Sequence, residues 1–549
     1  MPVIGAALAL AALAALAAAP AEAPHLRRAG TATQLVVDGA PFLVLGGELG
    51  NSTGEPAYLK TYWPKLRELG LNTVLAPVYW DQLEPQPGRF DFAQVDGLLA
   101  AARAQRMRLV LLWFGSWKNS MSCYAPAWVK SDPQRFPRAQ DSSGRGLEIL
   151  SPFADANRDA DARAFAALMR HLKAADGRDH TVVMVQVENE IGMIPEPRDR
   201  SAAADAQFAG PVPAELVGYL ADHAESLAPE VQALWSARGR PRSGTWEDVF
   251  GPGPATAEVF MAWHFGRYVQ AVTAAGKAEY ALPMFVNAAL VRPGYEPGQY
   301  PSAGPLPHLL DVWRAAAPAV DFLAPDVYFP NFAEWARRYA RGGNPLFVPE
   351  ALRSPDAAVN ALYAFGAHDA IGFAPFGIES TGEPASSLLA GAYAAVASLA
   401  PQLTAAQGQG RSAGLLPPAP ENQREPQRLR LNGYVLDVVY ERQPLPSLAD
   451  GVPAGGAAPA PAPMPAGGLV LATGPDEFVF AGVGFRVTFA PDTPGEPIAG
   501  LLSVEELAAR GGRLEHVRFL NGDQTHQGRH VRLEMGRIGI QRVKLYRYR

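Results

Sequence analysis

The chain alternates between short, almost uninterrupted apolar runs and longer segments in which apolar residues recur at helical spacing. Uninterrupted apolarity is what a strand buried on both faces requires, and parallel strands are such strands. Segments such as 57–70 and 95–106 separate the runs and have the pattern of amphipathic helices. The apolar runs lie at 42–49, 73–80, 108–115, 182–190, 282–290, 321–329, 345–351 and 370–378. Eight strand–helix units predict an α/β protein built on a (β/α)8 TIM barrel.

The pattern changes after residue 406, where the predicted barrel of residues 24–406 ends. A polar stretch rich in Gln, Gly and Pro, at 407–427, reads as a linker. Apolar residues then alternate with polar ones, which predicts a β-sandwich-like C-terminal domain over 428–549. Within the barrel, a segment rich in Pro, Gly, Ala and charge at about 196–253 reads as an insertion between the fourth and fifth strands.

The first 23 residues predict a secretory signal peptide. An Ala/Leu-rich apolar segment is followed by Ala21-Glu22-Ala23, a small-x-small cleavage site, so we expect an exported protein, periplasmic or extracellular. Alanine and Pro20 make a weak membrane span, and we expect no stable membrane anchor. The net charge of −6 without a basic tract argues against a nucleic-acid partner. The single cysteine, Cys123, excludes a disulfide framework.

Polar residues that close the apolar runs are the candidate site, because chemistry in a (β/α)8 barrel sits at the C-terminal ends of the strands. Glutamates, amides and aromatic rings around one rim suit a carbohydrate, whose hydroxyls bind amides and whose ring faces stack on aromatic side chains. We find no metal-ligand spacing, phosphate loop or nucleophile elbow, so no metal or cofactor is expected. The candidates are Glu48, Asn51, Tyr79, Trp113, Asn119, Asn189, Glu190, Asn287, Tyr328, Glu350 and Glu379.

Two of these carboxyl groups could form the acid pair of a glycoside hydrolase. Glu190 closes the fourth run and Glu350 the seventh, and in a closed barrel their side chains can converge to about 5–5.5 Å, the retaining separation. Glu350 would be the nucleophile, kept ionised by Tyr328, and Glu190 the general acid and then base. The residues alone leave two alternatives open. Glu188 lies on the same side of a regular strand as Glu190, and Glu350 could instead form a salt bridge with Arg353.

Three motifs stand out among the predicted strands: NTVLAPVYWDQLEPQPGRFDF (72–92), QVENEIG (186–192) and FVPEA (347–351). They resemble glycoside hydrolase family 35, the β-galactosidases, and the related family 42. The resemblance implies that Glu190 is the acid/base, that Asn189 binds the 2-hydroxyl and that Glu350 is the nucleophile. Further stretches resemble a bacterial branch of family 35 with a β-rich C-terminal domain: GGELGNS (46–52), WFGSWKNSMSCYAPAWV (113–129), TWEDVFG (245–251) and NGDQTHQGRH (521–530).

The chain also departs from the family pattern where the sugar would be recognised. The stretch Cys-Ala-Glu-Trp that is usual after the third strand is replaced by Gly115-Ser116-Trp117-Lys118-Asn119, and Ile191 stands where an aromatic residue is usual. The resemblance predicts a retaining exo-glycosidase that releases terminal β-D-galactosyl residues from oligosaccharides, including galactosylated plant cell-wall glycans. The alternatives are a clan-A exo-hydrolase for β-glucosyl or α-arabinosyl substrates, or a non-catalytic sugar-binding barrel.

Overall fold

The structure is a computed structural model that describes residues 22–418, 426–441, 464–493 and 497–549. All but the last two residues of the predicted signal peptide lie outside these ranges. A three-stranded antiparallel sheet opens the described chain, and its strands are β1 (His25–Ala29), β2 (Ala32–Val37) and β3 (Ala40–Phe42). Leu35 and Val37 of this sheet pack with residues of the barrel interior, so the sheet covers one end of the barrel.

The predicted (β/α)8 barrel is confirmed. In the described part of the chain, eight parallel strands close on one another, and each falls on one of the apolar runs. They are β4 (Val44–Glu48), β5 (Thr73–Tyr79), β6 (Arg108–Lys118), β9 (Val182–Asn189), β10 (Met284–Ala289), β11 (Phe322–Val327), β12 (Phe347–Ala351) and β13 (Gly372–Pro375). Alternate residues of these strands fill the interior, as Leu112 and Phe114 do, or pack outward against helices.

Helices surround the barrel and bury its outer surface. They are α1 (Pro56–Leu59), α2 (Trp63–Glu68), α3 (Trp80–Leu83), α4 (Ala93–Gln105), α5 (Ala127–Lys130), α6 (Asp155–Asp176), α11 (Pro254–Glu279), α12 (Leu310–Ala316), α13 (Phe332–Tyr339), α14 (Asp356–His368) and α15 (Leu388–Ala406). Shorter elements join them: the hairpin β7 (Arg138–Gln140) and β8 (Gly146–Leu150), and the 3-10 turns η1 (Arg341–Gly343), η2 (Ile378–Ser380) and η3 (Pro384–Ser386).

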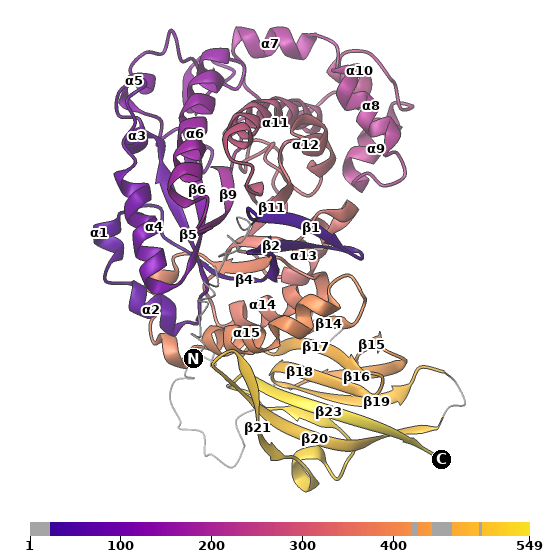
Figure 1. The fold of residues 1–549 in the computed structure, drawn as a ribbon. Coiled ribbons are helices and arrows are strands. Elements are labelled where there is room, and N and C mark those ends of the chain that lie inside the picture. The colour runs from indigo at the N-terminus through magenta and orange to yellow at the C-terminus, as the bar shows by residue number, and fades with distance from the viewer. Residues whose placement is uncertain (1–21, 419–425, 442–463, 494–496) are drawn as a thin grey trace, which may run out of the picture.

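The segment between β9 and α11 forms a group of short helices. These are α7 (Ala202–Ala209), α8 (Ala214–Asp222), α9 (Pro229–Ala237) and α10 (Trp246–Phe250). Helix α8 contacts α12, and α10 contacts α11, so the segment thickens the helical wall of the barrel. Figure 1 shows it at the opposite end of the molecule from the C-terminal sheets.

The C-terminal region contains two antiparallel sheets around a core of their own. Among the described residues, one sheet has the order β14-β17-β18-β23-β20-β21 and the other β15-β16-β19-β22. The strands are β14 (Ser412–Leu415), β15 (Gln427–Leu431), β16 (Tyr434–Tyr440), β17 (Gly467–Gly474), β18 (Glu477–Val483), β19 (Phe485–Pro491), β20 (Ile498–Arg510), β21 (Arg513–Phe519), β22 (Val531–Leu533) and β23 (Gly539–Tyr548), with the turn η5 (Gly522–Thr525) before β22. The range predicted as a linker, 407–427, thus contains strand β14, which packs on α14.

Helix α15 is the one helix in the described chain that is long and apolar enough to cross a membrane by length and composition alone. It is instead integrated into the barrel wall. The Tyr393 hydroxyl is buried and donates to the carbonyl oxygens of Gly46 and Phe373, at 2.8 Å each. Helix α15 also contacts α14 and strands of the C-terminal sheet. It therefore has the contacts of a core helix.

Candidate active site

The end of strand β9 directs its two glutamates to different places. Both Glu188 and Glu190 have positive φ angles, 61° and 45°, which non-glycine residues rarely adopt. The regular alternation of the strand is therefore lost. The Glu188 carboxylate turns toward the outer helices and accepts a hydrogen bond from the Trp117 backbone N–H at 2.7 Å. The Glu190 carboxylate turns into the mouth of the barrel, where the Asn119 side-chain amide donates to it.

Glu188 belongs to a buried carboxyl pair with Asp161 of α6. Asp161 accepts hydrogen bonds from the Trp113 indole at 2.8 Å and from the Ser116 backbone N–H at 3.1 Å. Burial, and then the nearby Asp161 carboxyl, raises the pKa of Glu188 well above its usual value. The partners of the Glu188 carboxyl are therefore another carboxyl group and backbone amides.

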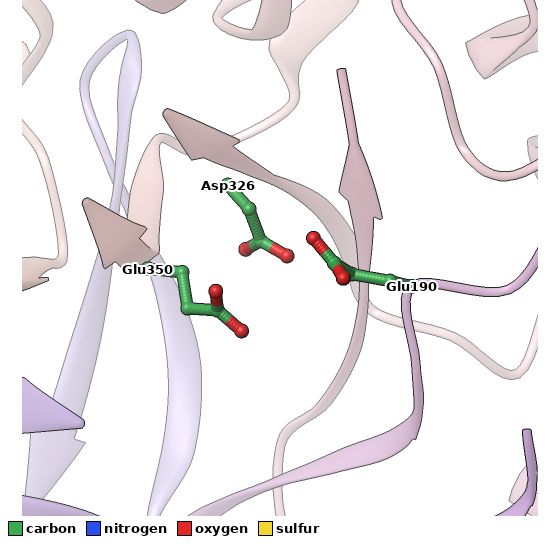
Figure 2. A group of neighbouring side chains, drawn as sticks. All are labelled: Glu190, Asp326 and Glu350. Carbon is green, nitrogen blue, oxygen red and sulfur yellow. The ribbon is translucent and has the colours of Figure 1, made fainter. Parts of the chain in front are cut away.

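Three carboxyl groups meet in the mouth: Glu190, Asp326 and Glu350. Each offers an oxygen atom that lies within 4.8 Å of the other two, and Figure 2 shows the three side chains converging from three strand ends. The register of the sheet explains the meeting, since Asp326 of β11 is directly paired with Glu350 of β12. All three are buried, with at most 5% of their surface exposed.

Glu190 has the environment of a carboxylic acid that keeps its proton near neutral pH. Its backbone N–H donates to the Asn287 side-chain oxygen at 3.0 Å, which fixes the main chain at this point. Burial, and then the negative charge of Glu350, raises the pKa of Glu190 to about 7, although Lys118 works in the opposite direction. A general acid requires such a shift.

Glu350 is oriented by the predicted tyrosine. The Tyr328 hydroxyl donates to Glu350 Oε2 at 2.5 Å, whereas Oε1 has no hydrogen-bond partner among the described residues. Arg353, the alternative partner for Glu350, turns elsewhere, and its guanidinium donates to the Ser380 carbonyl oxygen at 3.1 Å. One carboxylate oxygen of Glu350 is therefore held while the other remains available to a reacting atom.

Lys118 is a site residue that the sequence analysis did not assign. Its side chain is buried, and its ammonium donates to the Asn189 side-chain oxygen at 2.7 Å. Within the described part of the chain, the nitrogen of that same amide has no partner, and it can donate to a substrate hydroxyl. Burial alone would lower the pKa of Lys118. The surrounding carboxyl groups, of which Glu350 has the largest effect, outweigh burial and raise this pKa. Lys118 therefore stays charged and provides a positive charge among the acids.

Glu48 and Asp326 complete the group of acids around Lys118. Glu48 is fully buried at the end of β4, and its carboxyl oxygens accept no hydrogen bond from a donor group in the described ranges. Burial, and then Glu350, raises the pKa of Glu48 well above its usual value. Asp326 was not predicted, yet it is a charged residue in an apolar run, the same signal that singled out Glu350. Three carboxyl groups together have the chemistry to bind a cation. In this protein the Lys118 ammonium provides that positive charge.

The remaining rim candidates mainly hold the loop after β4. The Tyr79 hydroxyl accepts a hydrogen bond from the Gly54 backbone N–H at 3.1 Å, and its ring stacks on Tyr124 at 5.3 Å. The Glu379 carboxylate accepts from Thr53 Oγ1 at 3.0 Å and from the Gly50 backbone N–H. Asn51, in the same loop, has a buried side-chain oxygen without a partner.

The prediction of Trp113 as a substrate-binding residue is wrong. Trp113 is completely buried outside the barrel, where its ring packs near Phe165 of α6 and its indole donates to Asp161. The physical reason is the period of two in strand β6, which gives the interior positions to Leu112 and Phe114. A side chain between them cannot reach the mouth.

Comparison with known proteins places two family segments on this chain. Residues 34–224 match the model of glycosyl hydrolases family 35, and residues 389–532 match a domain of unknown function, DUF5597. A β-galactosidase of Xanthomonas manihotis is 34% identical over 193 residues, which are 34% of this chain and 29% of that protein. The chain thus spans less than a third of the curated relative that it matches. The resemblance to family 35 inferred from the motifs is confirmed, and the matched segment contains Glu190 but not Glu350.

Solved structures of β-galactosidases also resemble the chain. The enzyme from the psychrophilic Marinomonas ef1 is 14% identical with a TM-score of 0.43, and the alignment covers 65% of this chain and 60% of that one. The cold-adapted enzyme from Rahnella sp. R3 is 17% identical with a TM-score of 0.44, with coverage of 65% and 56%. The barrel fold of this chain is established by the pairing of its own strands.

Proposed function

From the family-35 segment and the acid pair, we propose that this protein is a retaining exo-glycosidase that hydrolyses terminal β-D-galactosyl residues. The observation that carries the proposal is the pair Glu190 and Glu350, whose carboxyl oxygens lie within 4.8 Å. Retaining glycosidases hold their two carboxyl groups about 5–5.5 Å apart, whereas inverting enzymes leave about 6.5–9.5 Å for a water molecule. The short separation therefore favours double displacement.

In the first step, Glu350 attacks the anomeric carbon while Glu190 gives its proton to the leaving-group oxygen. A covalent galactosyl–Glu350 ester results, and the aglycone leaves as an alcohol. Glu190, now ionised, takes a proton from water, the water oxygen attacks the anomeric carbon, and Glu350 is released as a carboxylate. The raised pKa of Glu190 supports the first step, and the Tyr328 hydroxyl holds Glu350 in line.

The sugar would be recognised mainly by Asn189 and by the groups around Lys118. Lys118 binds the oxygen of the Asn189 amide, so only the NH2 group faces a sugar hydroxyl. The unpartnered oxygens of Glu48 offer a further position for hydroxyl groups. Lys118 belongs to the stretch after the third strand where this chain departs from the usual family pattern, and we propose that it helps to define which sugar enters.

We propose that a bulky leaving group occupies a cavity that has Tyr328 in its wall. The cavity has a volume of about 830 Å3; the Tyr328 hydroxyl contacts Glu350, whereas the two carboxyl groups do not themselves line the cavity. Its wall includes aromatic and amide side chains, among them Phe329, Asn331, Asn360 and Tyr363. Aromatic faces and amides are the groups that bind oligosaccharide chains. We therefore propose galactosylated oligosaccharides, including plant cell-wall glycans, as substrates.

We also propose that the protein is exported. The Ala/Leu segment and the Ala21-Glu22-Ala23 site support this proposal. Sequencing the N-terminus of the mature protein from the exported fraction of its host tests it. A mature chain that begins after Ala23 is expected, and an intact N-terminus would contradict export by this route.

The reaction is tested with a panel of aryl glycosides and with chemical rescue. We expect β-galactosides to be cleaved faster than β-glucosides and α-arabinosides, and galactosylated oligosaccharides to be cleaved as well. Azide should rescue Glu350→Gly to give the α-galactosyl azide and Glu190→Ala to give the β-galactosyl azide. A different preferred sugar would replace the substrate in this proposal, and wild-type rates in both variants would refute the mechanism.

A further inference from the structure

The hydrogen bonds around Asp326 determine which of its oxygens can carry a proton. The Asn287 side-chain oxygen accepts the Glu190 backbone N–H, so the NH2 group of that amide must face Asp326. It donates to Asp326 Oδ2 at 2.6 Å. Oδ2 is therefore an acceptor, whereas Oδ1 is buried and accepts no hydrogen bond from the residues that the structure describes. A proton on this carboxyl would reside on Oδ1.

The surroundings of Asp326 contain many acids and one cation. The titratable groups that act on it come from several elements: Glu48 of β4, Lys118 of β6, Glu190 after β9, Glu350 of β12, Tyr328 after β11 and Tyr339 of α13. The proposed reaction keeps one negative charge on the pair Glu190 and Glu350 throughout, and Lys118 balances it. A second carboxylate at Asp326 would be a buried charge without a counterion, which is costly.

We propose that Asp326 is a neutral carboxylic acid that donates a hydrogen bond from Oδ1 into the space between Glu190 and Glu350. It acts as a positioning residue, and its role rests on the function proposed above. When Glu190 gives its proton to the leaving group, it becomes a buried carboxylate, and the Asp326 O–H stabilises that form. No proton leaves Asp326 in this step.

The electrostatics of the cluster agree with this geometry. Burial, and then the charges of Glu350 and Glu190, raises the pKa of Asp326 well above its usual value. The direct interaction of the two carboxyls raises the pKa of Asp326 and lowers that of Glu190. These are the directions expected when Asp326 is the donor and Glu190 the acceptor.

Two variants of Asp326 separate the neutral acid from a carboxylate. Asp326→Asn keeps an oxygen acceptor for Asn287 and replaces O–H by N–H, so the alkaline limb of kcat/KM should stay at its wild-type pH. Asp326→Ala removes the donor, and kcat should fall about 10- to 100-fold, as for a lost hydrogen bond to a charged group. Without the donor the pKa of Glu190 rises, and the alkaline limb of kcat/KM should move to higher pH.

An ionised Asp326 predicts the opposite result for the asparagine variant. Removing a negative charge beside Glu190 would lower its pKa, so the alkaline limb would move to lower pH and kcat would fall. That outcome would overturn the proposal. The profiles are measured on the aryl glycoside that the wild-type enzyme cleaves fastest.

Infrared difference spectroscopy detects the protonation state of Asp326 without any substrate. We expect the spectrum of wild type minus Asp326→Asn to contain the carbonyl stretch of a protonated carboxyl. Glu188→Gln is the matched control, because it removes a different buried acid and must leave that band in place. A carboxylate band in the difference spectrum would refute the neutral acid. If no glycoside were hydrolysed, the proposed function would fail while the infrared result would still decide the state of Asp326.

Discussion

Two buried glutamates, two residues apart, lie in different chemical settings: Glu188 near the end of strand β9 and Glu190 directly after it. Glu188 faces the outer helices beside Asp161, and Glu190 faces the mouth beside Glu350 and Asp326. Both are buried, and in both burial and a second acid raise the pKa. Burial and a shifted pKa therefore do not identify a catalytic acid by themselves.

The difference lies in what surrounds the free polar atoms. Glu188 is completely buried beside Asp161, and its Oε1 lies against Gly115, where a methyl group would come within 2.7 Å of it. This carboxyl is therefore closed off from solvent. In the mouth, the unpartnered atoms of Glu48, Asp326, Glu350 and Asn189 belong to one group of interacting side chains around Lys118. Several unpartnered groups gathered around one reacting pair distinguish a site from a buried structural contact.

The largest difference in activity is expected when glutamine replaces each of the two glutamates in turn. Glu190→Gln removes the proton donor, so kcat on substrates with poor leaving groups should fall about 10²- to 10⁴-fold. Glu188→Gln leaves the mouth unchanged and should retain wild-type kcat/KM. Steady-state kinetics on aryl galactosides of different leaving-group pKa measure both. Equal losses in the two variants would remove the functional distinction between the two glutamates.

Lys118→Met tests the positive charge in the mouth, which has no counterpart among the described groups that shift the pKa of Glu188. The Lys118 charge lowers the pKa of Glu190, which lies at about 7, so its removal should move the alkaline limb of kcat/KM above that pH. Loss of the bond to Asn189 should also raise KM about tenfold. Lys118→Arg keeps the charge and should leave the limb near the wild-type position. A limb that does not move in the methionine variant would contradict this role.

Gly115→Ala tests the closed packing around Glu188. The new methyl group would lie 2.3 Å from the Trp113 indole nitrogen and 2.9 Å from Asp161. Such overpacking should lower the free energy of unfolding by about 1–3 kcal/mol, measured by urea denaturation. Folded molecules should retain their kcat. Gly144→Ala, in a surface turn where nothing lies within 4 Å of the added methyl group, controls for the loss of a glycine. Gly144 has a positive φ of 80°, so alanine is strained there as well. The comparison is therefore whether Gly115→Ala lowers the free energy of unfolding more than Gly144→Ala does.

The smallest effect concerns stability against pH. The folded-state pKa of Glu188 is raised above its ordinary value of 4.5, so its contribution to stability is complete below that pH. The contribution is lost as the pH rises through the folded-state pKa. Glutamine cannot ionise, and Glu188→Gln should therefore lose less stability than wild type between acidic and alkaline pH. Urea denaturation across that range measures the slopes, and parallel slopes would contradict the raised pKa.

The strands of the barrel could be predicted because each is a continuous apolar run, a property of local sequence. The choice between Glu188 and Glu190 could not be made from strand periodicity, because two positive φ angles interrupt the alternation at that point. Periodicity did hold at Trp113, where neglecting it led to the wrong assignment. Lys118 and Asp326 were missed because their roles depend on acids contributed by other strands.

The strand β14 has a consequence for anyone who divides this protein into fragments. It follows the last barrel helix directly, yet it forms an edge of the six-stranded sheet through its pairing with β17. Its Gly414 lies so close to α14 that a methyl group there would come within 2.6 Å of Tyr363. A fragment that begins at residue 428 would expose the hydrogen-bonding edge of β17, which invites aggregation. A barrel that ends at 406 would expose the α14 surface that β14 covers. The two halves share this strand, so they are best expressed together.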